Sequence, residues 1–195
     1  MHKIFKQIPL FALAISLNTG CHSANETQDA IATSPQEQFF QNLSTLCDKI
    51  YSGSVISTDP QDEEWRKEVL IITPGNCTET SLSIPLAVGE DTSRIWVITK
   101  TDTGLRLKHD HRHKDGTPDA VTQYGGDTQD RGTPTRQSFP VDDYSVALFE
   151  KEGLSASVTN VWSVEITPGE RFAYELSREG RFFRAEFNLA ASHRP

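Results

Sequence analysis

The fold of this chain is decided by the stretch VWSVEITPGERFAYELSREGRFFRAEFNL, residues 161–189. Within it, apolar side chains alternate with polar or small ones in three runs: Trp162/Val164/Ile166, Phe172/Tyr174/Leu176 and Phe183/Ala185/Phe187/Leu189. Two turn-forming pairs, Pro168-Gly169 and Glu179-Gly180, separate the runs. A period of two between such turns predicts consecutive antiparallel strands that are buried on one face.

The same pattern extends towards the N-terminus. A short apolar run, Val69-Leu70-Ile71-Ile72, precedes two alternating sets, Leu82/Ile84/Leu86 and Ile95/Val97/Thr99. We therefore expect a mostly β fold of about nine or ten strands. The expected architecture is an antiparallel up-and-down barrel that resembles the lipocalins, and a sandwich or jelly roll is the alternative.

A helix is expected before the first strand. Ser34 can cap a helix that has Pro35 at its first position and Glu37 at its third. Apolar residues at helical spacing continue the pattern to Tyr51, and Gly53 can end it. The barrel should therefore carry an N-terminal helix with one apolar face.

Two features are expected between the strands. One further short helix is predicted from Asp142 to Glu152, where Gly153 can close it. The polar, glycine-rich stretch GGDTQDRGTPTR, residues 125–136, is predicted to be a mobile loop near a mouth of the barrel.

Length, composition and charge limit the possible functions. The chain has 195 residues, of which 36% are hydrophobic and 24% charged, which fits one domain with a real core. Its net charge of -8 argues against nucleic acid, which requires a basic surface. We therefore expect a monomer with a single β-rich domain over residues 35–191 and no nucleic-acid partner.

A targeting segment is predicted at the N-terminus. Lys3 and Lys6 precede an apolar run over residues 8–17, and Gly20-Cys21 follows it. Ten residues make a helix of about 15 Å, which is half the hydrocarbon core of a bilayer and too short for an ordinary transmembrane span. The pattern predicts a secretory signal peptide over residues 1–20.

The exit of this segment resembles the signal of bacterial lipoproteins, in which the cysteine is acylated and becomes the mature N-terminus. The resemblance implies a lipid at Cys21, a flexible tether over residues 21–34 and an anchor in the membrane. His22 stands where Asp would resemble the inner-membrane retention signal, which favours the outer membrane, facing the periplasm. Simple secretion is the alternative. The body of the chain also resembles uncharacterised secreted bacterial lipoproteins, which implies an envelope location and no known activity.

The remaining cysteines are expected to form a disulfide. If Cys21 carries lipid, Cys47 and Cys77 are left as a pair in an oxidising compartment. The alternative is two buried free thiols. A zinc site is not expected, because neither cysteine has a second Cys or a His at ligand spacing.

One histidine-rich stretch stands out, LRLKHDHRH over residues 105–113. In a strand, His109, His111 and His113 continue the face of two leucines and should point inward. Asp110 lies between them, and Tyr124 returns alongside after a turn. We predict that these five residues bind a small ligand.

A metal site is the alternative use of the same strand. Neighbouring histidines such as His109 and His111 have Cα atoms about 6.6 Å apart and can converge on one divalent transition metal, with a ligand from another strand. This His-x-His step resembles the strand motif of carbonic anhydrases and cupins, without the rest of either pattern. A second alternative is that the imidazoles are hydrogen-bonded and only shape a polar pocket.

The acidic segment before Trp65 is interpreted as a surface turn. It contains Asp59, Asp62, Glu63 and Glu64. Their spacing fits no EF-hand loop, so a calcium site is the weaker hypothesis.

These observations favour an envelope lipoprotein whose barrel binds a small ligand or metal through a His-rich strand. One alternative is a metal-assisted hydratase, isomerase or oxygenase that uses the His-x-His step. Another is a structural envelope protein whose barrel is filled by side chains. Binding is favoured over catalysis, and no catalytic residue is assigned.

Overall fold

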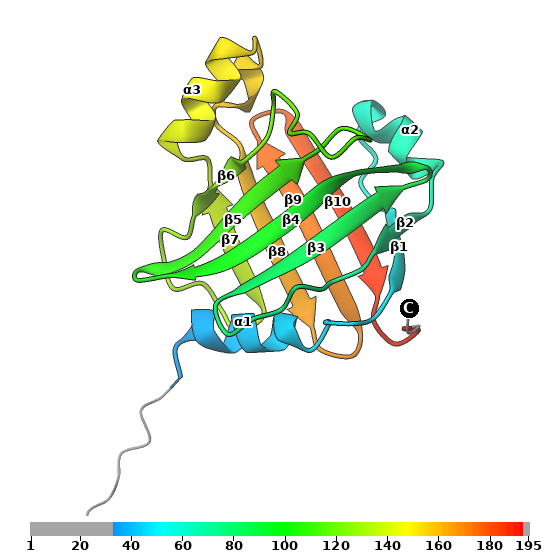
Figure 1. Cartoon of the computed structure of the whole chain (residues 1–195), viewed down its shortest axis with the longest axis vertical. Coiled ribbons are helices and arrows are strands. Elements are labelled where there is room, and N and C mark those ends of the chain that lie inside the picture. Colours follow the sequence, from blue (N-terminus) through cyan, green and yellow to red (C-terminus); the bar gives the residue numbers. More distant parts are fainter. Residues whose placement is uncertain (1–32, 193–195) are drawn as a thin grey trace, which may run out of the picture. The chain divides into compact units, whose positions relative to one another are not determined.

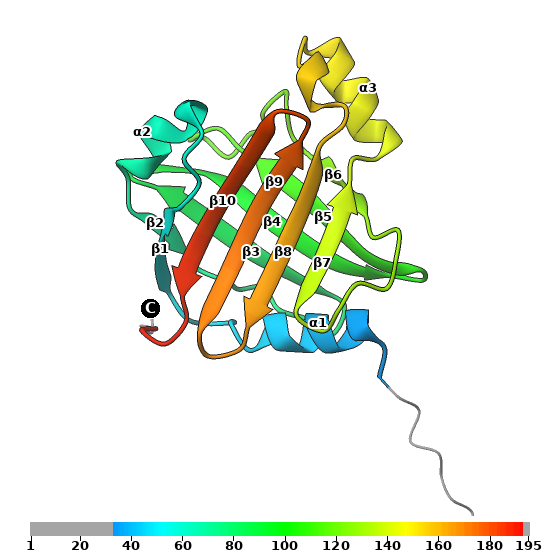
Figure 2. The same cartoon turned by 180° about the vertical axis from the view of Figure 1, so that it is seen from behind.

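The computed structural model describes residues 33–192. The predicted signal peptide, the predicted lipid at Cys21 and most of the predicted tether therefore lie outside the described residues. In the described part, ten antiparallel strands form one sheet in the order β6-β5-β4-β3-β2-β1-β10-β9-β8-β7 (Figures 1 and 2). The strands are β1 (Tyr51–Val55), β2 (Leu70–Ile72), β3 (Ser81–Val88), β4 (Asp91–Thr101), β5 (Gly104–His111), β6 (Tyr124–Asp127), β7 (Arg136–Pro140), β8 (Val161–Thr167), β9 (Arg171–Arg178) and β10 (Arg181–Asn188).

The sheet curves into a nearly closed up-and-down barrel, which confirms the predicted fold class. Consecutive strands are neighbours from β1 to β6 and again from β7 to β10, and β1 joins the two groups by pairing with β10. That pairing sets Gly53 opposite Phe187 and Val55 opposite Ala185. One continuous hydrogen-bonded order leaves no place for the two separate sheets of a sandwich.

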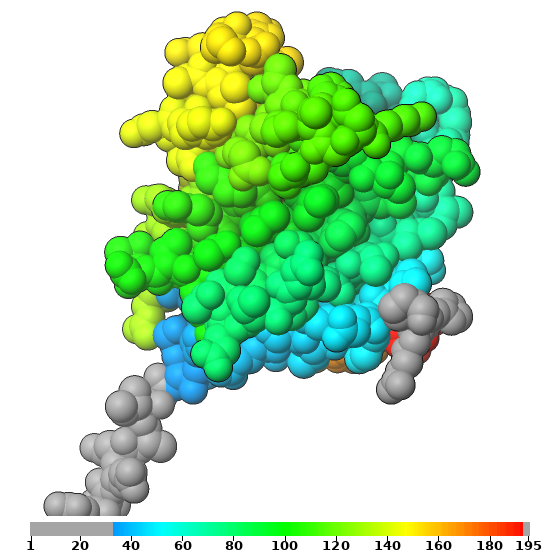
Figure 3. All heavy atoms as spheres, in the orientation of Figure 1, coloured from blue at the N-terminus to red at the C-terminus, as the bar shows by residue number. Residues whose placement is uncertain are grey.

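The alternating residues of β8, β9 and β10 fill the barrel as their spacing predicted. Register places Trp162 beside Leu176, and Leu176 beside Phe183, so each row continues across three strands. The core is formed by the inward side chains of the strands together with one face of the first helix. In the space-filling view, the strands β3, β4 and β5 present a continuous outer wall (Figure 3).

The helix α1 (Pro35–Ser44) lies across one end of the barrel (Figures 1 and 2). The hydroxyl of Ser34 accepts a hydrogen bond from the backbone N–H of Glu37 at 3.1 Å, as a helix cap should. Phe39 and Leu43 are completely buried, so α1 closes this end as a plug.

The prediction that this helix continues to Tyr51 was wrong. The helix ends at Ser44, Asp48 adopts a φ of 59°, and Tyr51 begins β1 opposite Ile72. Residues 46–51 have helical spacing only because a turn and a strand start bring apolar side chains to the same core.

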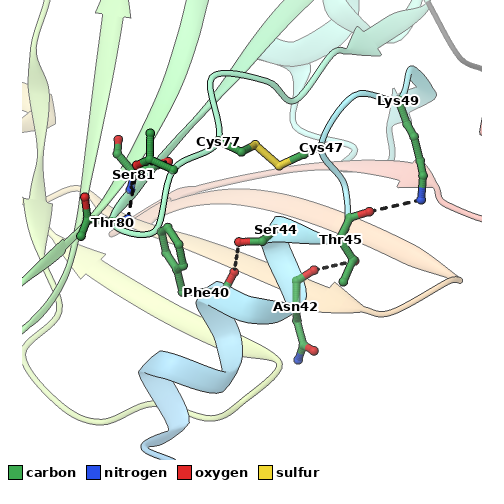
Figure 4. The surroundings of a disulfide bond; sticks show 10 residues. Phe40, Asn42, Ser44, Thr45, Cys47, Lys49, Cys77, Thr80 and Ser81 are labelled. Carbon is green, nitrogen blue, oxygen red and sulfur yellow. Dashed lines mark hydrogen bonds between the residues drawn. A yellow bond between two sulfur atoms is a disulfide. The ribbon is translucent and has the colours of Figure 1, made fainter.

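The predicted disulfide between Cys47 and Cys77 is confirmed, with Cα atoms 6.5 Å apart (Figure 4). It joins the segment after α1 to the connection between β2 and β3. The bridge therefore ties the plug helix to the wall of the barrel over a separation of 30 residues.

The seam between β6 and β7 is the place where the sheet does not pair. The backbone N–H of Asp142 donates to the carbonyl of Gly125 at 3.0 Å, and the N–H of Gly125 donates to the hydroxyl of Ser145 at 2.8 Å. Asp142 caps α3 (Asp143–Lys151), the short helix that the sequence predicted. The start of α3 thus bonds to the unpaired backbone edge of β6.

The predicted loop at residues 125–136 differs from expectation. Gly125 and Gly126 belong to β6, and the loop that follows lies at the closed end of the barrel, beside α1. The side-chain amide of Gln36 donates to Thr128 and to the carbonyl of Asp130, at 3.1 and 2.9 Å. Amino-acid composition identifies a polar loop but does not predict at which end of the barrel the loop lies.

The opposite end carries α2 (Glu63–Arg66), which the sequence did not predict, together with a 3-10 turn at Pro60–Asp62. A second 3-10 turn, Ser155–Ser157, follows α3. No helix within residues 33–192 is both long and apolar enough to cross a membrane.

Candidate functional site

A pocket of about 370 Å³ lies inside the barrel at the end where α2 packs, away from α1. Its apolar walls are mainly aromatic: Trp65, Trp96, Trp162, Tyr174 and Phe183. Its polar groups are Gln61, Asp62, Arg94, His109, His111, Tyr124 and Arg181. A concave, largely aromatic pocket with a few converging polar groups is the usual form of a small-molecule site.

Strand register builds one wall of this pocket. His109 pairs with Trp96 of β4 on one side and with Tyr124 of β6 on the other, so three rings form one inward row. His111 pairs with Arg94 in the next row towards the mouth. Inward side chains stand two residues apart along each strand, which is why these groups share one surface.

His109 is held by hydrogen bonds at both ring nitrogens. The carbonyl of Tyr124 can only accept, so Nδ1 carries the proton and donates to it at 3.0 Å. Nε2 then has no proton and accepts a hydrogen bond from the hydroxyl of Tyr174 at 2.6 Å. Complete burial lowers the pKa of His109 to about 3, so this imidazole is neutral at physiological pH.

A second imidazole and a second phenol form a similar pair nearer the mouth. The hydroxyl of Tyr124 lies 3.1 Å from Nε2 of His111. Burial, followed by the charge of Arg94, lowers the pKa of His111, and burial raises the pKa of Tyr124 to about 12. At neutral pH both groups are therefore uncharged and supply hydrogen bonds rather than charge.

Tyr174 connects the histidines to the aromatic wall. Its ring stacks on Trp96, with centroids 4.1 Å apart and planes 11° apart. Burial raises the pKa of Tyr174 well above that of an ordinary phenol. The hydroxyl therefore stays protonated and donates to His109.

The rim of the pocket carries charged groups in pairs. Arg181 donates from both terminal nitrogens to the carboxylate of Asp62 and lies 3.3 Å from Asp59. Arg94 pairs with Asp91. Burial pushes the pKa of Asp91 up, but hydrogen bonds from Ser93 and Arg94 outweigh it and hold this pKa at about 2.

One polar atom of the wall is left without a partner. The indole Nε1 of Trp162 is buried and has no hydrogen-bond acceptor among the described residues. A buried donor without an acceptor costs about 1–3 kcal/mol, so such atoms are rare in a core that serves stability alone.

The structure brings together three of the five predicted ligand-binding residues. His109, His111 and Tyr124 all line the pocket. Asp110 does not, because it alternates to the other side of β5, where it accepts a hydrogen bond from Arg112 at 2.9 Å. His113 follows the end of β5, and 58% of its side chain is exposed.

The predicted metal ligands have little capacity left for a metal. Among residues 33–192, no three His, Cys, Asp or Glu side chains are arranged to hold an ion. Both ring nitrogens of His109 are engaged, and Nε2 of His111 faces a phenol. A metal at His109 would have to displace the hydrogen bond from Tyr174.

Several residues of the pocket were not identified from the sequence. Asp62 was interpreted as part of a surface turn, yet it is 3% exposed and pairs with Arg181, 119 residues away. Arg94 belongs to no recognisable motif. It lies two residues before Trp96, so it shares a strand face with that ring, but the sequence did not show that this face points inward.

Comparison with known proteins gives no indication of function, so function is inferred from the residues of the pocket. No protein-family model, curated protein or solved structure matches the chain significantly.

Proposed function

We propose that this domain binds a small molecule inside its barrel, and that it does so as a lipid-anchored protein of the bacterial envelope. The observation that carries the binding proposal is the pocket of about 370 Å³, with aromatic walls and neutral hydrogen-bonding groups that converge from separate strands. A pocket of this size falls at the lower end of the range for small-molecule sites.

Two features support binding over a filled, purely structural barrel. His109 and His111 occupy positions where apolar side chains would pack without needing hydrogen bonds, as Leu105 and Leu107 do on the same face. Tyr124 and His111 are only partly buried and place neutral hydrogen-bonding groups at the same wall. Both features make sense if the wall contributes polar contacts to a ligand.

The polar groups of the pocket favour binding of a ligand over its chemical conversion. The metal-assisted alternatives need open imidazole nitrogens, and the His109 nitrogens are both in use. The partly buried pair of Tyr124 and His111 is neutral, which suits recognition of a ligand by hydrogen bonds.

We expect Leu176→Trp to weaken binding of the neutral fluorescent probe N-phenyl-1-naphthylamine at least tenfold. Leu176 is half-buried, lines the pocket and lies between Trp162 and Phe183 in register, so an indole there would fill the space. Losing the burial of one ring is worth more than about 1.4 kcal/mol, the equivalent of tenfold. Fluorescence titration of the purified domain measures the change.

The matched control is Leu154→Trp, because Leu154 is exposed and lies outside the pocket. This variant adds the same indole and should bind the probe as the unaltered protein does. Equal affinity in both variants would place the probe elsewhere, and no enhancement in the unaltered protein would count against the function itself.

The envelope part of the proposal rests on the lipoprotein-like signal that ends at Cys21. We expect mass spectrometry of the membrane fraction to find a mature chain that begins at Cys21 and carries acyl chains. Cys21→Ser should move the protein to the soluble fraction, because the acyl chains on Cys21, two or more of which make a stable attachment, are the expected anchor. An unmodified, soluble mature chain in the unaltered strain would contradict the anchor and leave the binding proposal intact.

A further inference from the structure

We infer that the pocket selects a compact aromatic ligand that carries one carboxylate, and that Arg94 holds this anionic group. The inference rests on the proposed small-molecule binding and specifies its ligand class. Its support is the position of Arg94, its unused donors and the charge balance of the other pocket groups.

Arg94 lies on the inward face of β4, at the level of the mouth. Register sets it between Leu86 of β3 and His111 of β5, both of which line the pocket. Its guanidinium lies over the ring of Trp65 in α2, with the central carbon 5.0 Å from the ring centroid. The charge is therefore positioned at the entrance, against an aromatic surface.

The guanidinium of Arg94 has donors that the protein does not use. Among the described residues its acceptors are Asp91 and Ser93, and both bond to the same nitrogen, Nη1. A guanidinium has five N–H donors, so those on Nε and Nη2 have no acceptor in the described part of the chain. Two such parallel donors fit the two oxygens of a carboxylate.

The other arginine of the pocket differs from Arg94 in this respect. Arg181 donates from both terminal nitrogens to Asp62, and Nη1 also donates to the carbonyl of Phe182. A second carboxylate, that of Asp59, lies 3.3 Å away. Arg181 thus holds the segment before α2 in place, and its charge is already matched.

Among the described pocket residues, Arg94 is the arginine whose Nε and Nη2 both lack an acceptor. His109 is neutral, because burial lowers its pKa to about 3. Of the charges that act on His111 and Tyr124, Arg94 has the largest effect, and it lowers both pKa values. Asp119, Asp91 and Asp110 act on His111 in the opposite direction, and Asp91 pairs with Nη1 of Arg94. Arg94 is therefore the positive group that acts most strongly on these two side chains, and its Nε and Nη2 remain available to bind an anion.

The walls indicate the rest of the ligand. Trp65, Trp96 and Phe183 line the pocket with aromatic rings against which a ring of the ligand can pack. The far end of the barrel is filled by the core and closed by α1, where Phe39 and Leu43 are completely buried. A long acyl chain has no channel to enter, so one or two rings fit better.

The test compares three probes on the unaltered domain by calorimetric titration: 2-naphthoate, its neutral isostere 2-naphthamide, and undecanoate, a linear carboxylate with the same number of carbons as 2-naphthoate. We expect 2-naphthoate to bind at least tenfold tighter than either other probe, because hydrogen bonds to a charged group are stronger than neutral ones.

The matched variants are Arg94→Gln and Arg106→Gln. Arg106 lies on β5 outside the pocket, where its Nε donates to Asp127 at 2.6 Å. Both variants remove one positive charge, so nonspecific attraction of the anion changes equally. Arg94→Gln should reduce the preference for naphthoate over naphthamide to less than threefold, whereas Arg106→Gln should keep it.

The outcomes separate this inference from the proposed function. Equal binding of naphthoate and naphthamide to the unaltered domain overturns the role of Arg94 and leaves the pocket as a binding site. Tighter binding of undecanoate overturns the aromatic ligand class. Loss of the preference in both arginine variants also overturns the inference. Failure of all three probes and of the neutral fluorescent probe counts against the binding function as a whole.

Discussion

Replacing His109 with phenylalanine should lower the free energy of unfolding at pH 7 by about 3 kcal/mol, since two buried polar groups lose their partner at about 1–3 kcal/mol each. The carbonyl of Tyr124 would lose its donor, and the hydroxyl of Tyr174 would lose its acceptor. Phenylalanine has a similar shape, so packing against Tyr124 and Trp162 changes little. Denaturant unfolding measures the difference.

The same substitution should change how stability depends on pH. The pKa of His109 is about 3 in the folded protein, against 6.5 for the exposed imidazole of the unfolded chain. Below pH 6.5 the unfolded state therefore binds a proton that the folded state does not, and stability falls by up to about 1.4 kcal/mol per pH unit until about pH 3. His109→Phe removes this dependence, so its deficit should shrink by about 2 kcal/mol between pH 6.5 and pH 5.

His113→Phe provides the control for both measurements. His113 lies on the same stretch of sequence, but 58% of its side chain is exposed, so its removal should change stability by less than about 0.5 kcal/mol. This variant should follow the pH dependence of the unaltered protein. A His109→Phe protein that keeps a constant deficit across this pH range would show that His109 is not the buried neutral group described above.

Replacing Gly126 with alanine should destabilise the domain by at least about 3 kcal/mol, because the seam between β6 and β7 has no room for a side chain. A Cβ at Gly126 would lie 1.7 Å from the backbone carbonyl oxygen of Pro140. The obstacle is main chain, so it cannot move aside as a flexible side chain could. Separation of β6 from β7 would relieve the clash, and it would carry Tyr124 away from the pocket.

Gly75→Ala is the matched control. Neither Gly75 nor Gly126 has a positive φ, so alanine meets no backbone strain at either position. The nearest atom to a Cβ at Gly75 is a carbonyl oxygen 3.9 Å away, which is ordinary contact. Thermal unfolding should show a large loss for Gly126→Ala and a shift within about 1 kcal/mol for Gly75→Ala. Similar stability in the two variants would show that the seam is not closely packed.

Much of the fold follows from local pattern in the sequence. Alternation with a period of two assigns most of the strands, and it correctly placed His109 and His111 beyond Leu107 on the face that points into the barrel. In β4 it did not decide the face, because both sets are apolar: Trp96 and Ile98 are buried, whereas Ile95, Val97 and Thr99 are only partly so. Capping residues located the start of α1 at Pro35. The pairing of Cys47 with Cys77 followed from elimination in an oxidising compartment.

Periodicity in the sequence did not locate the ends of the strands and helices. His113 was assigned to the inward face by continuing the period of two, but β5 ends at His111 and the chain turns away. Tyr51 fitted a helical spacing and belongs to a strand. Spacing reports which residues face a core and does not report where an element stops.

The sequence by itself thus determined most of the strands, the start of the plug helix and the disulfide, because each depends on residues close together or on simple counting. Only the tertiary structure decided the composition of the pocket. Arg94 meets His111 through the register of two strands, and Asp62 meets Arg181 because the first and last strands pair. The register of the strands and the closure of the barrel depend on contacts over the whole sheet, so no local sequence pattern predicts them.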